Sequence, residues 1–169
     1  MNLIELFNRI ESNIINGNTL EDCFSIINDY NGSDYIDYIH KDTNKYYRNI
    51  VMKNQNIELV VITWSKGQST CFHSHPGECI FKVLENEITE ELLKNTPDSS
   101  NTANTPDTTN LTNTTNIINT TNTTNLTNTT NLTNVYNTGD IGYIDNSIGT
   151  HRMLSSNDSV TLHIYYPPF

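Results

Sequence analysis

The N-terminal residues 1–45 carry apolar side chains at helical spacing. Within residues 2–15 an apolar side chain recurs every three or four positions, which predicts an amphipathic helix ending near Asn16 and Gly17. A second helix capped by Asn18 and a short third helix capped by Ser33 are expected to follow. The positions expected to be buried in the first two helices are Leu3, Leu6, Phe7, Ile10, Ile14, Leu20, Cys23, Phe24 and Ile27. We therefore predict that residues 1–45 form a helical cap on a single domain.

From residue 46 the pattern changes to short runs of β-branched and aromatic residues separated by turn residues, which is typical of strands. The expected strands are residues 46–51, 57–64, the segment around His73 and His75, and 79–84, with turns at 53–56, 65–68 and Asn86. Side chains alternate along a strand, so Cys79, Phe81 and Val83 should share one face. Residues 87–95 are charged and either end a strand or begin a short helix. Residues 46–95 are thus the first part of a predicted β domain.

A long tract from residue 96 to 138 consists almost entirely of Asn and Thr. Its segments 110–116 and 125–131 are near copies, which is typical of repeat expansion inside a surface loop. Such a tract has too few apolar groups to offset the entropy lost on ordering, so we predict a disordered insertion at residues 96–138. Without it about 126 residues remain, close to the commonest size of one domain.

Order is expected to resume at residue 139, and residues 139–169 should complete the β domain. The expected strands are Tyr143–Ile144, one beginning at His151, and Val160–Tyr165, with turns at 145–149 and 157–158. In the last strand Thr161, His163 and Tyr165 should face one side, with Leu162 and Ile164 on the other. Helices followed by six or more short strands predict a mainly β fold, an antiparallel barrel or sandwich behind a helical cap.

Composition narrows the class of protein. The net charge of −10 and the isoelectric point near 4.7, with only 9 Lys and Arg residues, disfavour binding to nucleic acid. The sequence shows neither a secretory leader nor an apolar segment of bilayer length, so we expect a soluble cytoplasmic monomer without a membrane partner. Three cysteines, Cys23, Cys71 and Cys79, fit no disulfide framework and should be free thiols in a reducing compartment.

The histidines carry the sharpest chemical signal. On a strand, His73 and His75 project from the same face and can converge on one metal ion, although two hydrogen-bonded surface histidines would have the same spacing. His151 and His163 are also candidates for the inner face of a barrel. Polar residues on a core face are costly unless a metal ion or a hydrogen-bond network satisfies them, so the four together favour a metal site.

These motifs resemble a known family. Gly67, the pair His73 and His75, and Cys79 are similar to the first cupin motif, with Cys79 where most cupins have a glutamate and Asn86 where glycine is usual. Residues 147–151 are similar to the second cupin motif. More narrowly, the chain resembles cysteine dioxygenase of type I in the segments 46–49, 73–75, 79–84, 144–152 and 162–169.

The resemblance implies a cupin-type antiparallel β-barrel (jelly roll) with N-terminal α-helices. It also implies a non-haem iron enzyme that adds both atoms of O2 to the sulfur of L-cysteine, giving cysteine sulfinate in cysteine catabolism and taurine-type pathways. One Fe(2+) per subunit would be held by His73, His75 and His151. Three neutral imidazoles leave the ion its full charge, which suits an anionic substrate.

The resemblance assigns further roles around the iron. Arg48, helped by Tyr46, would bind the substrate carboxylate through its planar guanidinium. Cys79 and Tyr165 would form a thioether crosslink. His163, supported by Thr161, would position the Tyr165 hydroxyl.

Other interpretations stay open. Without the resemblance, Arg48 would be an ordinary surface charge, Tyr46 a sheet residue, and Cys79 a buried thiol beside the aromatic ring of Tyr165. The substrate could be another small thiol with a carboxylate, such as 3-mercaptopropionate. The chain could also be a cupin that binds a metal ion without turnover.

Overall fold

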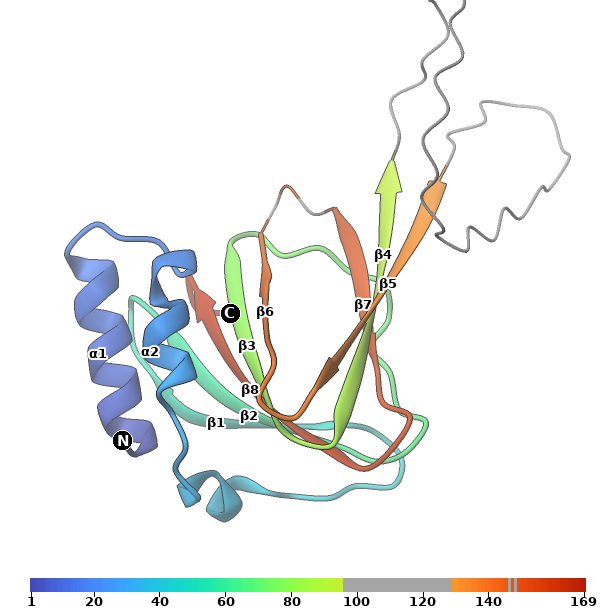
Figure 1. Ribbon diagram of the computed structural model, residues 1–169, viewed down its shortest axis with the longest axis horizontal. Coiled ribbons are helices and arrows are strands. Elements are labelled where there is room, and N and C mark those ends of the chain that lie inside the picture. Colours follow the sequence, from blue (N-terminus) through green and yellow to red (C-terminus); the bar gives the residue numbers. More distant parts are fainter. Residues whose placement is uncertain (96–128, 146, 148) are drawn as a thin grey trace, which may run out of the picture.

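The computed structural model describes residues 1–95, 129–145, 147 and 149–169. In chain order its elements are α1 (Leu3–Ile15), η1 (Glu21–Cys23), α2 (Phe24–Asn28), η2 (Asp34–Tyr38), β1 (Tyr47–Lys53), β2 (Glu58–Trp64), β3 (Glu78–Glu85), β4 (Glu87–Asn95), β5 (Thr129–Asn137), β6 (Ile141–Ile144), β7 (Thr150–Leu154) and β8 (Ser159–Tyr166). A five-stranded antiparallel sheet in the order β1-β2-β8-β3-β6 faces a three-stranded one in the order β5-β4-β7 (Figure 1). The predicted antiparallel jelly roll with N-terminal helices is confirmed.

The five-stranded sheet is buried on both faces. Every residue of β2 is buried, and its side chains alternate between two clusters. Leu59 and Val61 pack against the helices, whereas Val60, Ile62 and Trp64 lie in the cluster between the two sheets. A strand covered on both faces needs apolar side chains at consecutive positions, which accounts for the unbroken run in the sequence.

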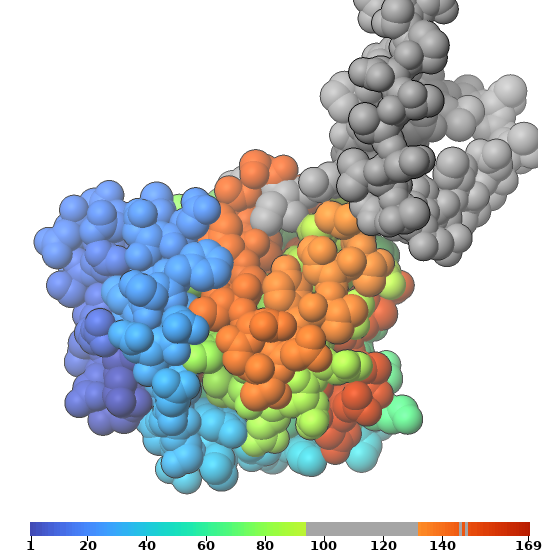
Figure 2. Space-filling model, viewed as in Figure 1, coloured from blue at the N-terminus to red at the C-terminus, as the bar shows by residue number. Residues whose placement is uncertain are grey.

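The helices cover the outer face of this sheet and lie at one end of the molecule (Figure 2). A capping box between Asn2 and Glu5 starts α1, and its five predicted apolar positions are buried. The second predicted helix is instead a 3₁₀ turn, η1, followed by the short α2. Phe24 was predicted to be buried but is 38% exposed. Leu20, Cys23 and Ile27 are buried against the sheet, and Phe24, the residue directly after the tighter 3₁₀ turn, faces outward.

A buried lysine joins the helical layer to the sheet. Lys82 lies on the outer face of β3, and its ammonium donates to the carbonyl oxygens of Ile27 (3.3 Å), Asn28 (2.9 Å) and Tyr30 (2.8 Å). These carbonyls lie at the C-terminal end of α2, where a helix leaves acceptors unpaired and favours positive charge. Burial lowers the pKa of Lys82, but the three carbonyls replace the water that its ammonium loses.

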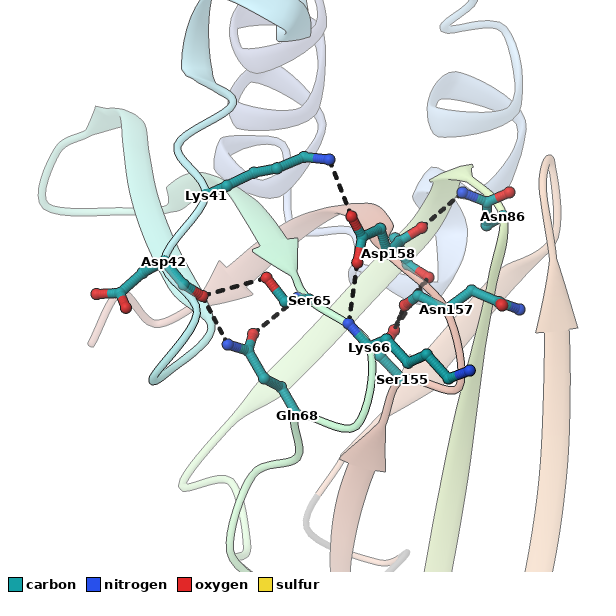
Figure 3. Close-up of polar contacts among 10 residues, drawn as sticks. Lys41, Asp42, Ser65, Lys66, Gln68, Asn86, Ser155, Asn157 and Asp158 are labelled. Carbon is teal, nitrogen blue, oxygen red and sulfur yellow. Dashed lines mark hydrogen bonds and ion pairs between the residues drawn. The ribbon is translucent and has the colours of Figure 1, made fainter.

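Three of the predicted turns meet at one end of the jelly roll (Figure 3). Asp158 accepts from the Lys66 backbone N–H at 3.0 Å and pairs with Lys41 at 3.0 Å, while its carbonyl accepts from the Asn86 side chain. Asn86 has the predicted left-handed conformation, with φ of 60°. These contacts connect the turns that follow β2, β3 and β7.

The segment containing His73 and His75 was predicted to be a strand, and that prediction is wrong. It runs beside β7 but makes only isolated bridges, one of them between His73 and His151. Between these bridges, the Thr70 hydroxyl accepts from the Met153 N–H at 3.0 Å. A side chain that takes a ladder donor in this way interrupts regular pairing.

Two further segments differ from the sequence prediction. Residues 87–95, which could have ended a strand or begun a helix, form β4. Residues 129–137, predicted to belong to the disordered insertion, form β5, which pairs with β4 along its whole length. Composition alone could not show that a partner strand was available to satisfy this backbone. The predicted disorder of residues 96–128 concerns residues outside the described part of the chain. No helix among the described residues is long and apolar enough to cross a membrane.

Replacing Lys82 with Met should destabilise the fold. The change would leave the Asn28 and Tyr30 carbonyls without their donor, whereas the Ile27 carbonyl keeps the Tyr30 N–H, and buried unpaired acceptors cost about 1–3 kcal/mol. We expect a lower free energy of unfolding in urea denaturation. The matched control is Lys66→Met at an exposed side chain, which should change it by no more than about 0.5 kcal/mol. Equal stability of the two variants would contradict the role of Lys82.

Candidate active site

A cavity of about 340 Å³ lies in the core between the sheets. Its lining residues are Tyr46, Arg48, Ile62, Trp64, Thr70, His73, His75, Cys79, Ile144, His151, Met153, His163, Tyr165 and Phe169. The eight residues predicted from the sequence to form the site are all among them. The volume is at the lower end of the range for small-molecule sites.

Three histidines converge in this cavity. His73 and His75 come from the loop after β2 and His151 from β7, and their ligand nitrogens all lie within 4.8 Å of one another. The Nε2 atoms of His75 and His151 are 2.8 Å apart. Two nitrogens at right angles about one ion, each roughly 2.1 Å from it, would be about 3 Å apart, so this spacing fits a shared metal ion.

Hydrogen bonds define which ring nitrogens are free. His151 Nδ1 lies 3.0 Å from Glu90 Oε1, and because a carboxylate can only accept, Nδ1 is the protonated nitrogen. His73 Nδ1 lies 2.9 Å from the Cys71 carbonyl and donates in the same way. Nε2 of each ring therefore keeps its lone pair for a cation.

Burial favours the neutral form of two of these imidazoles, His73 and His75. It lowers the pKa of His73 and, with the neighbouring histidines, lowers the pKa of His75 to about 4. A histidine must be neutral to bind a metal ion, so the lowered pKa values of His73 and His75 favour binding at pH 7.

Glu90 is a member of the site that the sequence analysis missed. It lies on β4 with 2% of its surface exposed, and besides His151 it accepts from the hydroxyl of Tyr136 at 3.2 Å. The available signal was its place between Ile88 and Leu92, since alternation along a strand puts all three on one face. A buried carboxylate behind a metal-binding histidine fixes the ring and raises its basicity.

Arg48 on β1 packs over the ring of Tyr165 and is held there by Glu58, a second buried carboxylate. Its Nη1 donates to Glu58 Oε1 at 2.9 Å, and its guanidinium carbon lies 5.1 Å from the centre of the Tyr165 ring. Its Nη2 is buried and has no hydrogen-bond partner among the described residues. Tyr46 stacks on Trp64 with ring centres 4.8 Å apart. The cavity thus contains a fixed cation with an unused donor.

Cys79 and Tyr165 are directly opposite each other on β3 and β8, and both are buried. The loop before Cys79 packs closely on the end of β8, because a Cβ atom at Gly77 would lie 2.3 Å from the Tyr166 carbonyl oxygen. This close packing lies directly before the position where Cys79 pairs with Tyr165. Burial raises the pKa of the Cys79 thiol and of the Tyr165 hydroxyl, so both are protonated at pH 7.

Among the described residues, the ring nitrogens of His163 contact Cys79 and Thr161, and no hydrogen bond joins His163 to the Tyr165 hydroxyl. Its Nδ1 lies 3.7 Å from Cys79 Sγ, and its Nε2 lies 2.9 Å from Thr161 Oγ1. Trp64 Nε1 donates to the same Thr161 oxygen at 2.9 Å. The predicted contact between His163 and Thr161 is thus present. The hydrogen bonds continue from Thr161 to Trp64 and from His163 to Cys79, and in the described part of the chain none runs from His163 to the Tyr165 hydroxyl. Burial lowers the pKa of His163 to about 3, so the ring is neutral.

Comparison with known proteins identifies the family. A family model described as cysteine dioxygenase type I matches residues 2–169. The chain belongs to the cysteine dioxygenase type I family. Members of this family are thiol dioxygenases of the cupin superfamily. Together with the cluster of three histidines, this places the chain among the metal-dependent dioxygenases. No curated protein sequence matches it significantly.

Solved structures with the same fold are distant in sequence. An RmlC-like cupin protein from Desulfovibrio desulfuricans is 18% identical, with a TM-score of 0.52 and coverage of 83% of this chain and 99% of the other. A conserved protein with a double-stranded β-helix domain from Klebsiella pneumoniae is 13% identical, with a TM-score of 0.52 and coverage of 82% and 91%. At such low identity these likenesses show the fold alone, and they agree with a cupin jelly roll.

Replacing Glu90 with Gln should weaken metal binding by about tenfold, because a neutral amide can still accept from His151 but no longer raises its basicity. Anaerobic titration of the metal-free protein with Fe(II) would measure this. Glu91→Gln is the matched control, since Glu91 pairs with Arg152 at 2.7 Å and does not line the cavity. Equal affinity of the Glu90 variant and the wild type would contradict the role of Glu90.

Proposed function

We propose that this protein is an iron-dependent dioxygenase that converts L-cysteine to cysteine sulfinate. The observation that carries the proposal is the presence, in one small cavity, of three converging histidines and an arginine whose buried Nη2 has no hydrogen-bond partner among the described residues. The first can hold a metal ion and the second can bind a carboxylate. A thiol that carries a carboxylate matches both.

The residues fit Fe(II), held by His73, His75 and His151 with one ion per chain. The donor set is all imidazole, which suits iron among other first-row metals, and the spacing of the ligand nitrogens matches a single ion. When bound, the iron would supply the redox chemistry that joins O2 to sulfur. In the net reaction the thiol R–SH and O2 give R–SO2H, which loses a proton at neutral pH, so no further reductant is needed.

The side chains of the cavity would bind and orient the substrate. Nη2 of Arg48 is available to a substrate carboxylate, and a charge-assisted hydrogen bond there is stronger than a neutral one. Tyr46, stacked on Trp64, lines the same cavity and would assist. The apolar lining, which includes Ile62, Ile144 and Met153, would exclude water from the reacting sulfur.

We further propose that Cys79 and Tyr165 form a thioether. A bond between Cys79 Sγ and a ring carbon of Tyr165 requires loss of the thiol hydrogen and one ring hydrogen, with O2 as the acceptor of the two electrons. Their opposed positions on β3 and β8 support this pairing. His163 would orient the pair through its contact with Cys79.

We propose a cytoplasmic monomer that acts in cysteine catabolism. Small-molecule substrates and no macromolecular partner would suffice for that reaction, and size-exclusion chromatography would test the monomer.

The iron-loaded protein should consume O2 when L-cysteine is added and form cysteine sulfinate in equal amount. An oxygen electrode and chromatography of the product would measure both. His151→Ala should abolish iron retention and turnover together, because it removes one of three ligands. If the protein instead prefers 3-mercaptopropionate, its substrate is a carboxylate-bearing thiol that lacks the amine. Tight iron binding without O2 uptake would leave a cupin that does not catalyse the reaction.

Intact-mass analysis should detect the thioether. After incubation with Fe(II), cysteine and O2, the wild type should lose the mass of two hydrogens relative to its sequence, whereas Cys79→Ser should not. Cys71→Ser, at an exposed thiol, is the matched control and should show the same loss as the wild type. The full sequence mass in the incubated wild type would contradict the crosslink.

A further inference from the structure

Glu58 is a buried carboxylate that the proposed chemistry does not use. It is the first residue of β2, its side chain is 0% exposed, and its cross-strand neighbours are Lys53 and Tyr165. A carboxylate removed from water is costly unless cations and hydrogen bonds compensate it. The residues that compensate Glu58 therefore indicate what it is for.

Both oxygens of Glu58 are engaged by residues of the cavity wall. Oε1 accepts from Arg48 Nη1 at 2.9 Å, and Oε2 accepts from the backbone N–H of Phe169 at 3.0 Å. The Phe169 ring lines the cavity, 4.8 Å from the ring of Tyr165 and 5.6 Å from that of His75. One carboxylate thus fixes both the cation and an aromatic wall of the site.

The geometry leaves the buried Nη2 of Arg48 available. Glu58 takes Nη1, while the buried Nη2 has no partner among the described residues. An arginine side chain has many rotamers, and fixing it before binding removes an entropy cost from the binding of the substrate. A guanidinium held at Nη1 can present Nη2 in a constant direction.

Lys53 contacts the same cluster from the protein surface. Its Nζ lies 3.6 Å from Glu58 Oε2 and also donates to the backbone oxygen of Phe169. Arg48 and Lys53 are thus two cations beside one buried carboxylate, which offsets the cost of burying Glu58.

We propose that Glu58 is a positioning residue that makes this site selective for thiols bearing a carboxylate, by fixing Arg48 toward the carboxylate end of the substrate. This inference rests on the proposed dioxygenase function and concerns its choice of substrate.

The test is binding of two thiols to the anaerobic, iron-loaded protein by calorimetry. L-Cysteine carries the carboxylate, and cysteamine lacks it. Glu58→Gln should weaken L-cysteine binding about tenfold, because one amide oxygen cannot replace two charged acceptors. Cysteamine binding should change less than about twofold, since it makes no use of Arg48. Glu91→Gln, which removes an arginine-paired carboxylate outside the cavity, should alter neither.

A double-mutant cycle separates positioning from a general structural effect. If Glu58 acts through Arg48, adding Glu58→Gln to Arg48→Ala should cause no further loss of L-cysteine affinity. Weakened binding of both thiols alike, or unchanged L-cysteine affinity, would overturn the inference. If Glu58→Gln does not fold, Lys53→Met tests the anchoring of Glu58 at a partly exposed position, because it removes a cation that contacts both Glu58 and the Phe169 oxygen. It should weaken L-cysteine binding alone, and no change would overturn the inference.

Failure of the proposed function would look different. A wild-type protein that binds iron but shows neither L-cysteine binding nor O2 uptake would remove that function and, with it, the basis for a role of Glu58. An active wild type whose Glu58 variant keeps its preference for L-cysteine would remove only the inference.

Discussion

Burial of both faces of the five-stranded sheet is the constraint on which the rest of the structure depends. The outer face needs the helical layer, and the inner face, opposite the three-stranded sheet, contains the cavity. Each strand that passes through the centre therefore contributes to two environments in alternation. On β8, Leu162 and Ile164 pack against the helices, while His163 and Tyr165 reach the cavity. The helices thus support the site without touching it.

Two buried carboxylates organise the polar groups of the cavity in the same manner. Glu90 on β4 holds His151, and Glu58 on β2 holds Arg48. Neither carboxylate is among the residues that line the cavity. Each fixes the side chain in front of it, and in a low-dielectric interior such charged hydrogen bonds define a single arrangement. The site is therefore built in two layers, with the groups that meet ligands supported by acids behind them.

The membership of the candidate site could be read from the sequence because its signals are local. Several of these signals depend only on residues close in sequence. They are the spacing of His73 and His75, the pattern around His151, and the alternation of Thr161, His163 and Tyr165. Resemblance to a family added Arg48, Tyr46 and Cys79. The roles of Glu58 and Glu90 were not predicted, because a glutamate in a strand is common and its role depends on its partner on another strand. No local sequence pattern identifies that partner.

The amphipathic first helix, most strands and the left-handed turn at Asn86 followed from residue type and period alone. Tertiary structure decided where local preference was weak or misleading. Phe24, directly after the 3₁₀ turn η1, faces outward, and β5 forms from Asn and Thr because β4 offers a complete ladder. The loop of His73 is no regular strand because Thr70 takes a donor of β7. In each case the deciding partner is distant in sequence, so only folding brings it into contact.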